Sequence, residues 1–245
     1  MNLLGDAIAW IFSGDPGAGL APVPIALLQH LFYTFVSVVI AAVIAVPLGW
    51  LIGHTGKGRD IAVAISGAAR AIPSFGLLIL LFLLLGVLRT AEAAVITFVL
   101  LAIPSILAGA YTGFEAIDRK VIDAARSMGM TQWQILWRVE VPLGLTLLIA
   151  GLRSATLQVV ATVTIAAFIN LGGLGQYILA GIPLRRFDIV LGGALLVAAL
   201  ALVLDGAFAL LQRVSVPAGI RAAQSEHRSG PKRTAAPRTA APARA

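Results

Sequence analysis

The chain contains no cysteine among its 245 residues. Disulfide bonds, thiolate metal sites and a cysteine nucleophile are therefore excluded, and the sequence carries no mark of its redox compartment. Charged residues are scarce at 12%, whereas hydrophobic residues make up 59% and the mean hydropathy is +0.96. A soluble domain of this length needs more polar surface, so the composition indicates an integral membrane protein.

The sequence also lacks the motifs of several enzyme classes. The pattern G-x-x-x-x-G-K-[ST] does not occur, so the chain has no P-loop with which to hydrolyse ATP. The patterns H-E-x-x-H and G-x-S-x-G are missing too, which argues against an intramembrane enzyme. His30 and His54 each stand alone, and we expect neither of them to bind a metal. We expect no enzyme activity and no cofactor.

Five segments are long and apolar enough to cross a bilayer core of about 30 Å, which takes about 20 helical residues. They run over about residues 27–53, 71–88, 93–113, 141–169 and 189–211. The sequence thus predicts an all-α membrane protein, a polytopic bundle of about five spans, with six as the main alternative. Residues 1–26 lack the basic region of a signal peptide, and we expect an external lead-in lying at the membrane interface.

Basic residues set the expected orientation, because Lys and Arg concentrate in cytoplasmic loops. Most of the 18 basic residues fall before the second span, between spans three and four, or after span five. The N-terminus is then expected outside and the C-terminus in the cytoplasm, so the charge reflects topology and requires no nucleic acid. Residues 214–245, rich in Pro, Ala and Arg, predict a disordered basic tail that could touch anionic lipid.

A polar insert, residues 114–140, separates spans three and four. We expect a helix over 114–128, with Arg119 and Asp123 paired, a stop at Gly129 and a second helix that Thr131 caps. The residues alone leave two interpretations open. The insert could be a docking surface for another protein, with Ala124 and Ala125 allowing close approach. It could equally be an amphipathic hairpin on the membrane, with its tryptophans as anchors.

The spacing in this insert resembles the EAA loop of ABC importer permeases. That pattern is E-A-A, three residues, Gly, nine residues and I-x-L-P, and here it occurs as 123–125, Gly129 and 139–142, with Asp for Glu and two Val substitutions. The resemblance implies a type I importer permease (MetI-like) fold. It also implies that the loop is a coupling helix, which docks on an ATPase subunit. Its implied coupling residues are Asp123, Ala124, Ala125, Met128, Gly129, Met130, Thr131 and Pro142.

Further stretches are similar to the permeases that import glycine betaine, choline and carnitine. They lie at 71–74, 111–113, 124–131, 150–153 and 172–175, whereas Asn170-Leu171 departs from the usual Gly-Ala pair. The resemblance implies half of a pore, a second permease chain, ABC ATPases and an extracytoplasmic solute-binding protein in a bacterial cell membrane. The alternatives are another small solute, such as an amino acid or a small anion, or a secondary transporter. Secondary transporters usually have more spans. With only 7% aromatics and no aromatic cluster expected in the spans, a partner is expected to select the solute.

Polar residues inside the spans are the remaining candidates. Arg153 and Asp205 both fall in the inner half of the membrane, and we expect them to pair or to share a polar interior. Thr156 shares a face with Arg153 and either lines the path or bonds between helices. Beyond the fourth span, Gly172, Gly173 and Gly175 predict a flexible external gate loop.

Overall fold

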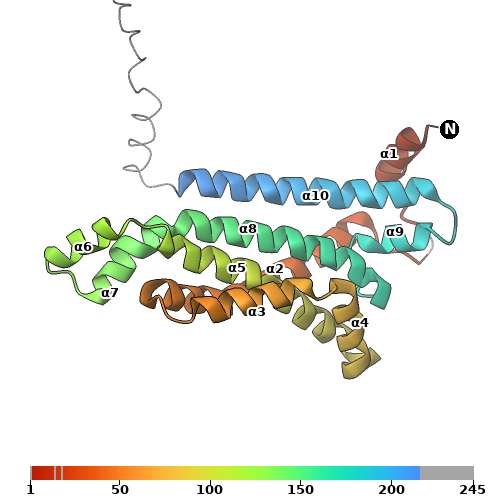
Figure 1. Cartoon of the computed structure of the whole chain (residues 1–245). Helices are drawn as coiled ribbons and strands as arrows, with labels where there is room; N and C mark the ends of the chain where they lie inside the picture. Colours follow the sequence, from red (N-terminus) through yellow and green to blue (C-terminus); the bar gives the residue numbers. More distant parts are fainter. Residues whose placement is uncertain (1, 14, 18, 216–245) are drawn as a thin grey trace, which may run out of the picture.

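The computed structural model describes residues 2–13, 15–17 and 19–215, and all regular structure within them is helical (Figure 1). The helices, in chain order, are α1 (Leu3–Ser13), α2 (Val23–Thr55), α3 (Arg59–Ala71), α4 (Ser74–Leu85), the 3₁₀ turn η1 (Val87–Arg89), α5 (Thr90–Glu115), α6 (Arg119–Ser127), α7 (Gln132–Ile135), the π-helical turn η2 (Leu136–Glu140), α8 (Val141–Ala166), the 3₁₀ turn η3 (Ala167–Ile169), α9 (Gly175–Gly181) and α10 (Phe187–Val214). The expected tail begins at residue 214, and nearly all of it lies outside the described residues.

The membrane spans are the long apolar helices. Four stretches qualify: α2, α5 with η1, the continuous helix from α7 through η3, and α10. The pair α3 and α4 meets the same criterion as one bent span, which brings the total to five. The prediction of an all-α bundle with about five spans is confirmed. The described part of the chain contains no sixth such helix.

The second span is broken rather than straight. Its two halves meet at an angle of 84°, and Ile72 and Pro73 lie between them. Proline favours an extended conformation in the residue before it, and Ile72 has ψ of 124°. The chain therefore turns through nearly a right angle at Pro73, and α4 runs across the direction of α3 (Figure 1).

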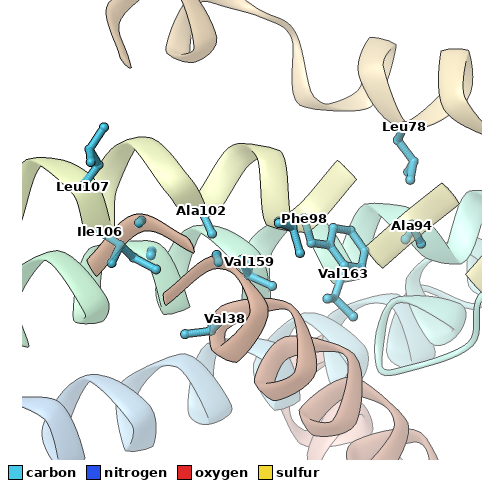
Figure 2. Packing of buried hydrophobic residues seen from close by; sticks show 14 of the residues in the cluster. Val38, Leu78, Ala94, Phe98, Ala102, Ile106, Leu107, Val159 and Val163 are labelled. Atoms are coloured by element: carbon cyan, nitrogen blue, oxygen red, sulfur yellow. The ribbon is translucent and has the colours of Figure 1, made fainter. Parts of the chain in front are cut away.

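The centre of the molecule is α5, which packs between α2 and α8. In its most apolar window 67% of the residues are buried, against 33% or less in the other three long spans. Figure 2 shows Phe98, Ala102 and Ile106 of α5 close to Val38 of α2 and Val159 of α8. These side chains form one continuous core that fixes the three helices relative to one another.

Glycines bring the backbones of these three helices unusually close. A Cβ added at Gly109 would lie 2.7 Å from the Leu147 carbonyl oxygen, and one at Gly113 would lie 2.6 Å from that of Gly144. On the other side of α5, a Cβ at Gly53 would lie 2.8 Å from Cβ of Phe114. Small residues of this kind allow membrane helices to pack backbone against backbone.

The two ends of the bundle carry different structures (Figure 1). We call residues 116–131, with α6, the connector, and residues 170–175 the glycine loop; they lie at opposite ends. At the glycine-loop end, α1 packs against α10, where Trp10 occupies the space that a side chain at Gly192 would need. Trp10 also packs edge-on against Tyr177 of α9, with ring centroids 5.0 Å apart. The N-terminal segment is thus part of the folded bundle.

Candidate functional site

The connector is a short helix closed by capping interactions at both ends. The Asp118 carboxylate accepts the Lys120 N–H at 2.9 Å and begins α6, so the single helix expected over 114–128 is wrong: α5 ends at Glu115 and the chain turns before α6. Gly129, with φ of 80°, ends α6 as expected. The N–H groups of Gly129 and Met130 return to the carbonyls of Arg126 and Ala125, which is the Schellman arrangement.

The second half of the polar insert joins the next span without a break. Thr131 and Gln134 form the expected capping box, with hydrogen bonds of 3.3 and 2.8 Å. The helix then runs continuously from Gln132 to Ile169, instead of starting again near Val141. Pro142 has no N–H to donate, and the preceding turn is π-helical, with the Val141 N–H bonded to the Leu136 carbonyl. The connector is therefore linked to the fourth span by a continuous helix.

The surface of the connector differs from the expected shallow spot. Ala125 is buried, so only Ala124 of the alanine pair lies at the surface. Met128 is 75% exposed and Trp133 is 69% exposed, which gives this end two apolar side chains open to a partner or to lipid. Asp123 lies 3.8 Å from Arg126 rather than pairing with Arg119, and exposed pairs of this type contribute little to stability.

Two side-chain contacts join elements at the end of the bundle that carries the connector. The His54 imidazole at the end of α2 lies 2.5 Å from the Glu140 carboxylate of η2, and Glu140 is only 7% exposed. Arg59 at the start of α3 contacts Glu115 at the end of α5, at 2.8 Å. These residues line a cavity of about 510 Å³ that also borders α6. These contacts join α2 to η2 and α3 to α5 at the end of the bundle that carries the connector.

Aromatic rings form a continuous row at the same end. Trp133 contacts Trp137, Trp137 contacts Trp50 of α2, and Trp50 stacks on Phe114 of α5, with centroid distances of 5.7, 5.6 and 6.1 Å. The expectation that the spans hold no aromatic cluster is therefore wrong at this end. The rings pack edge to face or stacked against each other, so they fill the space between α2, α5 and the helix formed by α7 and η2.

Inside the spans, Arg153 and Asp205 form the expected pair. The Arg153 guanidinium donates from Nε and from one terminal nitrogen to the two Asp205 oxygens, at 2.5 and 2.6 Å. This two-pronged geometry is the strongest that Arg and carboxylate form. About a third of each side chain is exposed in the single chain. Thr156 is buried, and its hydroxyl donates to the Leu152 carbonyl of its own helix, which leaves it no free hydrogen for a solute.

The glycine loop is closely packed, in contrast to the flexible turn expected from its composition. Gly173 and Gly175 are buried, and a side chain at Gly175 would overlap the Thr164 carbonyl. Gly172 and Gly173 have φ of 86° and 75°, which only glycine adopts readily. Asn170 ends η3 in the left-handed conformation, with φ of 60°. Asparagine tolerates this conformation better than most residues, so it fits the position although the related permeases usually have a Gly-Ala pair here.

Sequence reasoning missed three residues of these sites: Gln29 and His30, which bond the glycine loop, and Glu140. Each contacts a partner more than 80 residues away in the chain. All three are polar residues in or beside an apolar span, and a polar residue in such a place indicates a specific partner. The same reasoning led to the prediction for Arg153. Among the residues that the structure describes, no three His, Asp or Glu side chains gather to hold a metal ion.

A polytopic helical bundle, with a capped polar connector before its longest span, defines a membrane permease fold. Residues 45–214 match the sequence pattern of the family described as the binding-protein-dependent transport system inner membrane component. That range covers more than half of the chain, and the chain belongs to this family.

Named relatives cover most of this length. The chain is 35% identical over 196 residues to the carnitine transport permease protein OpuCB of Listeria monocytogenes, with 80% of this chain and 89% of the relative aligned. It is 37% identical over 199 residues to the osmoprotectant import permease protein OsmW of Salmonella typhimurium, with 79% and 91% aligned. Its fold is similar to a chain of the MetNI methionine ABC transporter, at a TM-score of 0.69 and 24% identity, covering 80% of this chain and 96% of that one.

Proposed function

We propose that this chain is the permease subunit of an ATP-driven importer for a small osmoprotectant such as glycine betaine, choline or carnitine. The observation that carries the proposal is the connector. The EAA-type spacing, from Asp123 to Pro142, covers the end of α6, the turn at Gly129 and the start of the helix that runs from Gln132 through a full membrane span. The solute class rests on the relatives, whose names refer to carnitine and osmoprotectant transport.

In this proposal, ATPase subunits grip the connector in the cytoplasm. Met128 and the small residue Ala124 are exposed there, while the Schellman turn at Gly129 sets the direction of α6. Closure of the ATPases moves the connector, and the continuous helix transmits that movement to the fourth span. A second permease chain completes the pathway, and an extracytoplasmic binding protein delivers the solute at the glycine-loop end. The N-terminus is then outside and the C-terminus inside.

The first test is recovery of the complex from its host. Tagged chain is isolated from detergent-solubilised membranes and its partners are identified by mass spectrometry. An ATPase and a solute-binding protein are expected, and the binding protein is then titrated with labelled glycine betaine, choline and carnitine. Recovery of the chain alone, under conditions that preserve a known ABC importer, would contradict the coupling role. Binding of an unrelated solute would contradict only the solute class.

Substitutions in the connector test its role in coupling. Gly129→Val forces a β-branched residue into φ near 80°, at a strain of about 1–2 kcal/mol. We expect the variant to insert in the membrane and to lose most uptake, while ATP hydrolysis by the complex continues. Ala124→Arg should have the same effect by blocking close approach.

Gly58→Val is the matched control, because Gly58 has φ of 82° and equally open surroundings but lies outside the connector. It carries the same strain, and uptake close to that of the unmodified chain is expected. Normal uptake in both connector variants, or equal loss in the control, would refute the docking role.

A further inference from the structure

The glycine loop is fastened to the start of the first span by two neighbouring side chains. The Gly173 N–H donates to the amide oxygen of Gln29 at 3.1 Å, and the Leu174 N–H donates to Nδ1 of His30 at 3.3 Å. Gln29 and His30 belong to α2, 144 residues earlier in the chain. Both bonds use backbone N–H groups of the loop, so they depend on its conformation rather than on its side chains.

The ring of His30 also has a fixed tautomer. A backbone N–H can only donate, so Nδ1 is the unprotonated acceptor toward Leu174, and the ring hydrogen is on Nε2. Nε2 lies 3.1 Å from the Val160 carbonyl of α8, which can only accept. His30 is fully buried. One side chain therefore bridges the first span, the fourth span and the glycine loop.

The glycines of the loop fit this arrangement closely. A Cβ at Gly172 would lie 2.5 Å from the Gln29 amide oxygen, and one at Gly173 would lie 3.4 Å from Nδ1 of His30. A side chain at Gly172 would push the loop away from α2, whereas one at Gly173 would only touch His30 but would be strained at φ of 75°. Glycine in the loop and the side chains of Gln29 and His30 on α2 therefore both favour the position in which the loop lies against α2.

We propose that Gln29 and His30 are positioning residues that latch the glycine loop closed, and that release of this latch opens the pathway at the end opposite the connector. The proposal rests on the proposed transport function, in which solute arrives at this end. The latch suits a reversible step because it consists of hydrogen bonds between neutral groups. Each hydrogen bond increases the population ratio of the closed loop to the open loop by about fivefold. A conformational cycle can overcome an effect of this size.

The cysteine-free chain allows the latch to be tested directly. Leu171 lies in the glycine loop and is 8% exposed, so Leu171→Cys should react slowly with a membrane-impermeant maleimide while the loop is closed. In this background, Gln29→Leu removes one acceptor. His30→Gln removes the other, because its side-chain amide occupies the place of Nε2 and keeps a donor toward Val160. We expect labelling about fivefold faster in each variant, and about 25-fold faster in the double variant.

His30→Asn is the matched control, because its amide oxygen occupies the place of Nδ1 and can still accept from Leu174. This variant loses the hydrogen bond to Val160 instead. Because the hydrogen bond to the glycine loop is kept, we expect a labelling rate within about twofold of that of Leu171→Cys alone. Unchanged labelling in Gln29→Leu and His30→Gln, or equal acceleration in His30→Asn, would overturn the latch. Labelling needs neither solute nor ATP, so an error in the transported solute leaves this result intact.

Discussion

Arg153 and Asp205 show how a charged residue is held within an apolar span. A lone charge at this depth is costly, and each of these side chains supplies the opposite charge that the other lacks. Their bidentate contact satisfies both carboxylate oxygens and leaves about a third of each side chain exposed. Hydrocarbon cannot solvate that exposed part, so we expect this face of α8 and α10 to meet water or a second protein chain.

The pair gives the clearest prediction at the level of single residues. Arg153→Ala or Asp205→Ala leaves one unpaired charge in the membrane, so less folded protein and lower uptake are expected. The exchange Arg153→Asp with Asp205→Arg restores opposite charges and should recover a large part of both. The amount of protein in the membrane and the uptake rate are measured in parallel. An exchange variant as inactive as the single variants would show that position, rather than pairing, determines the effect.

Among whole elements, α5 has the most demanding packing. Its glycines at 109 and 113 lie against the backbone of α8, and neither position has space for a methyl group. The four-residue spacing of these glycines repeats at Gly49 and Gly53 in α2, which face α5 from the other side. Because three backbones are in contact, we expect a displacement of α8 to move α5 and α2 with it.

The same substitution at two glycines tests this packing. Gly109→Ala places a methyl group 2.7 Å from the Leu147 carbonyl oxygen, and overpacking of this kind lowers stability by about 1–3 kcal/mol. Gly206→Ala in α10 meets nothing within 4 Å, so the helix gains about 0.5–1 kcal/mol from reduced backbone freedom. Thermal unfolding of the two purified variants in detergent should therefore shift in opposite directions. A parallel shift would contradict the close contact of α5 and α8.

For the molecule as a whole, local chemistry and hydropathy predicted a large part of the fold. The spans follow from apolar length, and the turn at Gly129 and the capping box at Thr131 follow from adjacent residues. The contact between His54 and Glu140 could not be predicted, because it joins positions 86 residues apart. The 84° bend of the second span could not be predicted from apolar length either, because it also depends on how α4 packs against α5.

The orientation of the whole molecule can be tested with one cysteine at each end. Met128 in the connector and Leu184 between α9 and α10 are 75% and 68% exposed, and the native chain has no cysteine to interfere. Since basic residues flank the connector, we expect Met128→Cys to react with an impermeant maleimide only after the cells are opened. Leu184→Cys should react in intact cells and should retain uptake, because Leu184 lies outside the connector. Reaction of Met128→Cys in intact cells would reverse the proposed orientation, and it would rule out docking of the connector on a cytoplasmic ATPase.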